Sequence, residues 1–431
     1  MTPEVKQRIE QIRRGEVPEG YKKTALGIVP ANWIETTLGE IYTERNEPGN
    51  DTLPLLMVSI HSGVSDGEVA EEDLPKKVKR IEDKSQYKHA MPGDLVFNMM
   101  RAWQGAIGSV RTEGMVSPAY IVAKPNELVD PVFMDYYMKT PRMVNILHRQ
   151  SYGVTDFRLR LYWDSFSPIP CVLPPLEEQR QIAEILSAQD AYISLQLKTL
   201  AAYQQLKKTF LAKLLPKGGS NEPELRFKGF SDAWEQRKFS EFTWNAGKRN
   251  KEGLELVPYA VTSDRGFVRQ DEAHDEFGYM RNVDRKAYNI VPPNSFAYNP
   301  ARINVGSIGY FKGEESVIVS SLYEVFQTAD YVDDTFLWQW FKSEAFNNWI
   351  ERLQEGSVRL YFYYDKLCEC QIFLPSLGEQ QKIAHACSNI DQLITLHQRR
   401  VDFTQTEKDA LMQLLLTGLV SVKRRNHGLL I

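Results

Sequence analysis

Two long stretches of the chain carry an apolar pattern that predicts helices. Residues 176–215 and 379–417 contain no glycine, and each lies just after a Leu-Pro pair and has glutamate and glutamine near its start. This composition is typical of a helix N-terminus. The first stretch stops at Pro216, which Lys217 and two glycines follow, and the second stops at Gly418. At 1.5 Å per residue, helices of about 40 residues would be about 60 Å long.

Apolar residues recur in both stretches at spacings of three, four and seven, which favours a packing seam. In the first they are Ile182, Leu186, Ile193, Leu197, Leu200, Phe210 and Leu214, and in the second Ile383, Ile390, Ile394, Val401, Leu411 and Leu415. Gln189, Gln196, His397 and Thr404 interrupt these registers. Two interpretations remain: each helix packs on its own domain, or the two helices pack on each other as an antiparallel pair. We favour the pair, because duplicated units usually make self-complementary contacts.

The segments before these helices, residues 33–172 and 234–373, have short apolar runs broken by glycine, proline and asparagine. Runs such as LVFNMM, YIVAK and SVIVSSLYEVF predict strands. The stretches FMDYYMKTPRMVNILHRQ and TFLWQWFKSEAFNNWIERLQ carry an apolar stripe and predict helices. We therefore expect two mixed units, each followed by a long helix.

An internal repeat relates the two halves. LPPLEEQRQIAEILSAQD, from Leu173, and LPSLGEQQKIAHACSNID, from Leu374, agree at nine of 18 positions with an offset of 201 residues. The same offset relates Trp33 to Trp234, and FNMMRAWQGAIG to YNPARINVGSIG. Stretches 44–85 and 120–158 diverge from 245–286 and 323–358. A retained frame with divergent inserts suggests one structural task performed twice, with each copy recognising something different.

Composition limits the classes of protein that this chain can belong to. With 431 residues, 42% hydrophobic and 25% charged, it has the profile of a globular protein with at least two cores. No apolar run approaches the roughly 18 residues that a membrane span needs, and the N-terminus lacks the apolar core of a signal peptide. We therefore expect a cytoplasmic protein. The four cysteines form neither a disulfide framework nor a zinc site and are expected to be buried thiols.

The usual signatures of catalysis are absent from the sequence. It contains no dinucleotide fingerprint, phosphate loop, zinc-protease helix or nucleophile elbow. Asn299-Pro300-Ala301-Arg302 partly matches the Asn-Pro-Pro-aromatic motif of amino-methyltransferases, but it lacks the second proline and the aromatic residue. The matching site in the first half begins at Asn98, so this motif belongs to the repeat. We expect no metal site and no catalytic residues in this chain.

The repeat instead presents N-x-x-R before a glycine-bearing strand. Asparagine and arginine contact base edges, and arginine also binds phosphate. In the alternative interpretation the asparagines cap a turn and the arginines form internal salt bridges. The net charge of −4 and the pI near 6.1 do not indicate a generic nucleic-acid binder, so DNA binding would depend on local patches. The candidate DNA-binding residues are Lys76, Lys77, Lys79, Arg80, Asn98, Arg101, Arg158, Arg160, Lys248, Arg249, Arg281, Asn299, Arg302 and Arg359.

The layout resembles the specificity (S) subunit of type I restriction-modification enzymes over essentially its full length. Four duplicated motifs carry the resemblance: W-x-x-x-x-L/F-x-E (Trp33 to Glu40 and Trp234 to Glu241), F/Y-N-x-x-R-x-x-x-G-x-I-G, V-S-P-A-Y or V-S-S-L-Y, and L-P-x-L-x-E-Q-x-x-I-A. None is strong alone, but the ordered set, present twice, is highly specific. One departure is Gly378, where the first copy has Glu177.

The resemblance implies an α+β tandem duplication: two mixed α/β target-recognition domains joined by two long antiparallel coiled-coil-like helices with pseudo-twofold symmetry. The expected parts are an N-terminal arm (1–30) packed near the second helix, a first target-recognition domain (31–173), a first spacer helix (174–217), a second domain (218–374), and a second spacer helix with tail (375–431). Each domain would recognise one half of a bipartite, asymmetric double-stranded DNA target.

The resemblance also implies the partners. The spacer helices would dock two modification subunits, which bind S-adenosylmethionine and methylate adenine, and restriction subunits with ATP-driven translocase and nuclease activity would join them. S-adenosylmethionine, ATP and Mg²⁺ are expected on those partners, and none in this chain. The candidate docking residues are Ile182, Leu186, Ile193, Leu200, Ile383, Ile390, Ile394 and Val401. Two alternatives stay open: a fused modification or nuclease enzyme, and a scaffold on a coiled coil that binds no DNA.

Overall fold

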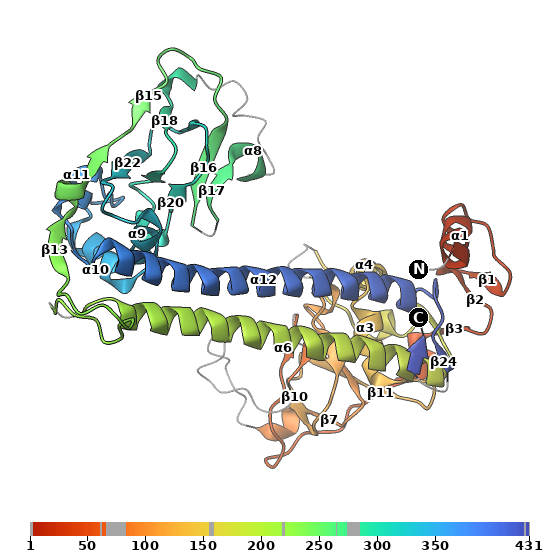
Figure 1. The fold of residues 1–431 in the computed structure, drawn as a ribbon. Helices are drawn as coiled ribbons and strands as arrows, with labels where there is room; N and C mark the ends of the chain where they lie inside the picture. Colours follow the sequence, from red (N-terminus) through yellow and green to blue (C-terminus); the bar gives the residue numbers. More distant parts are fainter. Residues whose placement is uncertain are drawn as a thin grey trace. The chain divides into compact units, whose positions relative to one another are not determined.

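The structure is a computed structural model that describes residues 3–60, 63–65, 83–154, 159–217, 220–263, 265–273, 285–425 and 428–430 (Figure 1). The chain forms two compact units. The first comprises Met1–Gln196 with Arg400–Ile431, and the second comprises Leu197–Arg399. Each unit thus contains one half of each long helix, α6 (Leu176–Leu214) and α12 (Leu377–Leu416). The expected five-part division ends each domain before a helix begins, and it stays a prediction.

The first unit builds a small α+β fold before α6. Its helices are α1 (Pro3–Arg13), α2 (Leu38–Ile41), α3 (Pro131–Met138), α4 (Pro141–Gln150) and α5 (Trp163–Phe166). Its strands are β1 (Tyr21–Thr24), β2 (Gly27–Pro30), β3 (Ile34–Thr37), β4 (Tyr42–Glu44), β5 (Val58–Ser59), β6 (Gly63–Val64), β7 (Lys88–Ala90), β8 (Leu95–Asn98), β9 (Ile107–Ser109), β10 (Gly114–Val116), β11 (Tyr120–Pro125) and β12 (Pro170–Leu173), with β24 (Lys423–Arg425) and β25 (Gly428–Leu430) after α12.

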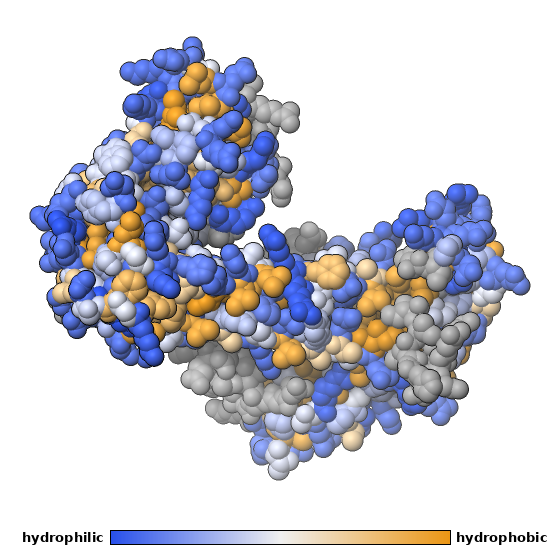
Figure 2. Space-filling view, in the orientation of Figure 1, coloured by the Kyte–Doolittle hydropathy of each residue, from blue (hydrophilic) through white to orange (hydrophobic). Residues whose placement is uncertain are grey.

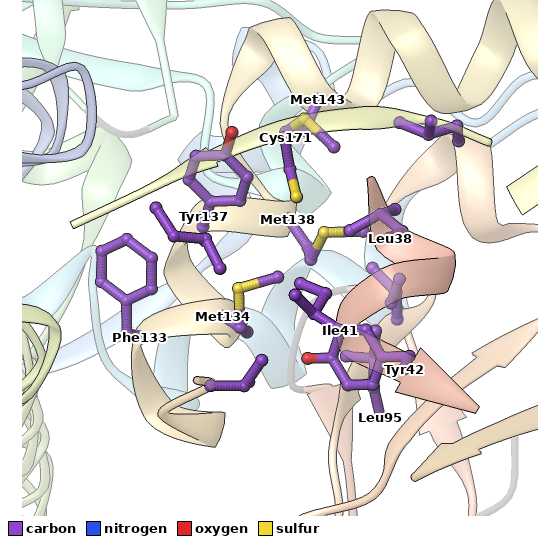
Figure 3. Packing of buried hydrophobic residues seen from close by; sticks show 14 of the residues in the cluster. Leu38, Ile41, Tyr42, Leu95, Phe133, Met134, Tyr137, Met138, Met143 and Cys171 are labelled. Atoms are coloured by element: carbon purple, nitrogen blue, oxygen red, sulfur yellow. The ribbon is translucent and has the colours of Figure 1, made fainter. Parts of the chain in front are cut away.

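The core of the first unit lies between an antiparallel sheet and two short helices. The sheet has the strand order β4-β11-β8-β9. Figure 3 shows Leu38 and Ile41 of α2 close to Met134 and Met138 of α3, and all four are buried. Fully burying a side chain of this size is worth roughly 1.5–3 kcal/mol. Asp130 caps the N-terminus of α3 by accepting a hydrogen bond from the backbone N–H of Phe133, and the proline in the first turn adds to this start signal.

The N-terminal segment packs against the end of α12 within the first unit. The Tyr21 hydroxyl of β1 donates to the carbonyl of Gly418 at 3.0 Å. Arg8 of α1 donates in turn to that hydroxyl at 3.2 Å. These contacts agree with the expectation that the segment lies near the second helix.

The second unit repeats this plan with a larger second sheet. Its strands are β13 (Glu235–Lys238), β14 (Thr243–Asn245), β15 (Lys248–Arg249), β16 (Pro258–Thr262), β17 (Gly266–Arg269), β18 (Asn289–Val291), β19 (Ser295–Tyr298), β20 (Ile308–Phe311), β21 (Val317–Val319), β22 (Glu324–Thr328) and β23 (Gln371–Leu374). Its short helices are α7 (Phe239–Phe242), α8 (Gln270–Ala273), α9 (Asp334–Trp340), α10 (Glu344–Leu353) and α11 (Tyr364–Glu369). The strand order β14-β22-β19-β20 matches the order β4-β11-β8-β9 of the first unit. A second, five-stranded sheet has the order β15-β18-β21-β16-β17, and its strands come between those of the first sheet in the sequence.

The repeated motifs have the same structural tasks in both units. Trp33 and Trp234 are buried, and the glutamate seven residues later caps a short helix: Glu40 accepts from the backbone N–H of Thr37 at 2.9 Å, and Glu241 from that of Lys238 at 3.2 Å. This explains the W-x-x-x-x-L/F-x-E pattern as an element of the fold.

The glutamine of the E-Q motif joins each long helix to its own domain. Gln179 accepts from the backbone N–H of Asp130 at 2.9 Å, and its amide donates to the carbonyl of Leu128 at 2.8 Å. Gln380 accepts from Asp333 at 2.8 Å and donates to the carbonyl of Tyr331 at 3.2 Å. Both glutamines are buried, so losing either partner set would leave unsatisfied backbone groups.

Within each unit the halves of α6 and α12 lie side by side and run antiparallel (Figure 1). In the first unit Lys408 pairs with Asp190 at 2.5 Å, and Arg400 lies over the ring of Tyr192, so the numbering falls along one helix as it rises along the other. In the second unit Lys207 pairs with Asp391 at 2.6 Å, and Tyr203 stacks on His397. The antiparallel pair is confirmed. The helices also pack on the domain cores, so both interpretations of the apolar seam hold.

Two further expectations concern thiols and membranes. Cys171, Cys370 and Cys387 are buried and free, as expected, whereas Cys368, which interacts with the side chain of Tyr364, is only partly buried. Burial raises the pKa of Cys171 to about 12 and that of Cys387 to about 11, so these thiols stay protonated. No helix within the described part of the chain could cross a membrane.

Candidate nucleic-acid interface

The N-x-x-R sequence forms the same turn in both units. After β8, the side-chain carbonyl of Asn98 accepts from the backbone N–H of Met100 at 2.9 Å, and after β19 that of Asn299 accepts from Ala301 at 3.0 Å. A single 3₁₀ turn follows each arginine and ends at Gly105 or Gly306, whose φ angles are 99° and 86°. Only glycine adopts this conformation without strain, which explains the glycine of the repeat.

The arginines of this turn, Arg101 and Arg302, project into solvent. Both are exposed, and the ion pairs found among the described residues include neither of them. The alternative interpretation is therefore correct for the asparagines, which cap a turn. It does not hold for the arginines, because no internal salt bridge of theirs is seen in the described part. A guanidinium without a carboxylate partner has its donors available for phosphate or for a base.

In the second unit this turn borders a groove of about 770 Å³, which we call the second-unit groove. The groove is lined by residues from five segments of the chain: 245–249, 289, 299–302, 321–325 and 359–363. It brings together four of the predicted residues, Arg249, Asn299, Arg302 and Arg359. Three of these are arginines, and no carboxylate pairs with them among the described residues.

Aromatic rings and one acid complete the groove. Tyr361 and Tyr363 stack in parallel, with centroids 5.5 Å apart and an interplanar angle of 3°. Glu324 is half-buried, and burial, with a smaller contribution from the charge of Asp365, raises the pKa of its carboxyl group. Sequence reasoning missed Glu324 and Tyr363. The repeat could have identified Glu324, because the first copy has an apolar residue at the matching position.

The other predicted residues are not gathered in this way. Arg160 is exposed in the first unit, where its backbone pairs with that of Tyr152, and the Tyr152 ring lies tilted against that of Tyr162, with centroids 5.2 Å apart. Lys248 is exposed on β15 but does not line the groove. Six predicted residues lie outside the described part of the chain: Lys76, Lys77, Lys79, Arg80, Arg158 and Arg281.

The residues predicted for partner docking are mostly inside the molecule. Ile182 and Leu186 belong to the core of the first unit and Ile383 to that of the second. Ile193, Leu200 and Val401 are also buried, whereas Ile390 and Ile394 are partly exposed. A buried side chain holds a helix in place, so contacts with a partner would fall to other residues of the same helices. The docking role itself stays a prediction.

A second set of apolar residues on the helices faces solvent, and of these the sequence reasoning named only Leu197, which it wrongly placed in the packing seam. In the second unit Leu396 is 60% exposed, and in the first Phe403 is 64% exposed. Figure 2 shows apolar residues at the surface along the helices. The exposed members are Leu195 and Phe403 in the first unit and Leu197, Leu206, Leu377, Leu393 and Leu396 in the second. On α12 the spacings of 3 and 7 from Leu393 through Leu396 to Phe403 would have revealed this second stripe.

Comparisons with known proteins agree with this architecture. The family model described as type I restriction modification DNA specificity domain matches residues 269–402. The chain is 25% identical over 440 residues to the putative type I restriction enzyme MjaX specificity subunit of Methanocaldococcus jannaschii, which covers 94% of this chain and 97% of that protein. Together these matches indicate a type I restriction-modification specificity subunit.

Further similarities support this assignment. The type I restriction enzyme MjaVIII specificity subunit of the same organism is 24% identical over 338 residues, covering 73% of this chain and 76% of the relative. Two solved structures share the fold, each with a TM-score of 0.53. One is from work on assembly and conformational transition of the type I R-M system (16% identical, 91% of this chain and 99% of that chain). The other is the S subunit from M. genitalium (13% identical, 89% and 96%).

Proposed function

We propose that this specificity subunit binds a bipartite, asymmetric double-stranded DNA target, each unit recognising one half. The observation that carries the proposal is the N-x-x-R turn, built twice by the same hydrogen bonds and each time presenting an exposed arginine. Because both units keep these arginines while their targets should differ, phosphate contacts suit them better than base contacts. The divergent stretches then recognise the bases.

The chain itself performs no catalysis in this proposal. Two modification subunits dock on α6 and α12, bind S-adenosylmethionine and methylate adenine, and restriction subunits that use ATP and Mg²⁺ cleave the DNA. The exposed apolar residues of the helices support docking, because side chains such as Leu396 and Phe403 would leave water on association. The complex would act in the cytoplasm. The target adenine would be extruded into a pocket of the modification subunit.

An exchange of domains tests the division of the target. Residues 33–172 are replaced by the matching unit of a related specificity subunit, and the chimera is assembled with its modification subunits. Mapping of methylated adenines should then show one half of the motif changed and the other half, with its spacing, retained. A reciprocal exchange of residues 234–373 serves as the control and should change the opposite half. Alteration of both halves by one exchange, or of neither, would contradict the proposal.

A further inference from the structure

The second-unit groove differs from the equivalent place in the first unit at the level of the sheet itself. In the first unit β8 and β11 pair Phe97 with Ile121, and in the second β19 and β22 pair Tyr298 with Glu324. The strand register therefore matches Glu324 to Ile121, which is buried in the first core. An acid stands in the second copy where the same frame accepts an isoleucine.

This acid is placed at a cost to the fold. Glu324 is half-buried and accepts a hydrogen bond from the backbone N–H of Tyr364, but it has no cationic partner among the described residues. The neighbouring Tyr298 is fully buried with a hydroxyl that has no described hydrogen-bond partner. Polar groups in such positions destabilise a protein unless their partners satisfy them fully. A ligand with N–H donors would supply a further partner for the Glu324 carboxylate inside the groove.

The remaining groups that line the groove match the other parts of a nucleotide. The parallel rings of Tyr361 and Tyr363 offer a face on which a base stacks, and exposed Arg249, Arg302 and Arg359 offer guanidinium donors for phosphate. The volume of about 770 Å³ lies within the range of small-ligand sites. A paired base cannot enter such a groove without leaving the duplex stack.

We propose that the second-unit groove binds a single nucleotide, with the base stacked on Tyr361, an amino group of the base donating to Glu324, and the phosphate held by the arginines. The nucleotide is either one extruded from bound DNA or a free nucleotide. Thymine offers only its N3–H, between two carbonyl oxygens that a carboxylate repels, so bases with an exocyclic amino group bind better than thymine. The DNA-borne source rests on the proposed function, and the free source does not.

The first experiment measures binding of dAMP, dGMP, dCMP and TMP to the full chain by calorimetry. The three nucleotides with an amino group should bind more tightly than TMP. Glu324→Gln should remove that preference, and Tyr361→Ala should weaken all of them by about 5- to 150-fold, the equivalent of the ~1–3 kcal/mol that one stacked base contributes. Arg149→Ala, at an exposed arginine in the last turn of α4 in the first unit, is the matched control and should leave the binding of all four nucleotides unchanged. Thermal melting of each variant verifies folding.

The second experiment distinguishes the sources with three duplexes: one fully paired, one with a single unpaired cytosine and one with a single unpaired thymine. Tighter binding of the unpaired cytosine, lost in Tyr361→Ala, assigns the groove to a DNA nucleotide. Binding of monophosphates without any preference among duplexes assigns it to a free nucleotide. If neither probe responds to Glu324→Gln or Tyr361→Ala, the proposal is wrong. Failure of the proposed function would instead leave monophosphate binding intact while the paired duplex does not bind.

Discussion

Individual side chains of the repeat frame fall into two groups, those that build the fold and those that face outward. Gln179, Gln380, Glu40 and Glu241 satisfy backbone groups at helix starts. Asn98 and Asn299 do the same within a turn and thereby position the arginine that follows three residues later. A motif can therefore recur because the backbone needs it, while the side chain it positions carries the function.

Arg302→Ala should weaken DNA binding uniformly across sequences. If Arg302 contacts one phosphate, the slope of log K against log salt should decrease in magnitude by about 0.9, since one fewer counterion is released. Titration of labelled duplexes at several salt concentrations measures this. Arg101→Ala tests the matching position of the first unit and should have the same effect. A loss confined to one base pair of the target would instead identify Arg302 as a base-reading residue.

Glu178 makes the stability of the first unit depend on pH. Burial raises the pKa of its carboxyl group, and the indole of Trp33, which donates to it at 3.3 Å, offsets only part of this effect. Because the folded pKa lies above the unfolded value, the folded state binds the proton more readily. Protonation of Glu178 therefore increases the free energy of unfolding as the pH falls through the raised pKa.

Glu178→Gln should stabilise the protein at neutral pH, because it removes a half-buried charge, and should flatten this pH dependence. The measurement is the difference between the melting temperatures of wild type and variant from pH 7 downward. That difference should shrink as the pH falls, since the wild-type carboxyl becomes neutral as well. Asp135, Glu324 and Asp334 also have raised pKa values, which is why the difference between proteins, and not one curve, is informative.

At the scale of elements, the long helices were predictable and the sheet-end loops were not. The expected helices, 176–215 and 379–417, agree with Leu176–Leu214 and Leu377–Leu416 to within two residues at every end, and the start of the first is the same, because long glycine-free sequence before strong stop signals leaves little choice. The second helix begins two residues earlier than expected and includes Gly378. The strands around Asn98 and Asn299 also followed from their apolar runs. The second-unit groove could not be predicted in this way, because Arg249, Glu324 and Tyr363 are far apart in sequence and meet only through the strand order.

The two apolar stripes of the helices should respond differently to the same substitution. Ile193 is 7% exposed, so Ile193→Asp buries an unpaired charge and should destabilise the fold by several kcal/mol. Leu396→Asp and Phe403→Asp change exposed positions and should alter stability by less than about 0.5 kcal/mol. We expect these two variants to retain the wild-type melting temperature and to lose assembly with modification subunits. Normal assembly in gel filtration by both would exclude this stripe as the docking surface.

For the whole molecule, the proposed division of labour leaves the chemistry to other chains. Within the described residues, no group of three histidine, cysteine, aspartate or glutamate side chains could hold a metal ion. The purified chain should transfer no methyl group from S-adenosylmethionine to DNA and should not cleave DNA, and adding modification subunits should restore methylation. A tritium-transfer assay measures the first activity. Methyl transfer by the chain alone would show that the fused-enzyme alternative is correct.

The division of the chain into units also determines the order in which they can form on the ribosome. The second unit is contiguous, Leu197–Arg399, whereas the first needs Leu415 and Leu416 of α12 to complete its core. During synthesis from the N-terminus, domains generally fold as they emerge. The first unit therefore cannot complete its core until Leu415 and Leu416 have been synthesised, and apolar side chains such as Ile182 and Leu186 stay uncovered until then. The second unit is therefore the one that reaches its final form first.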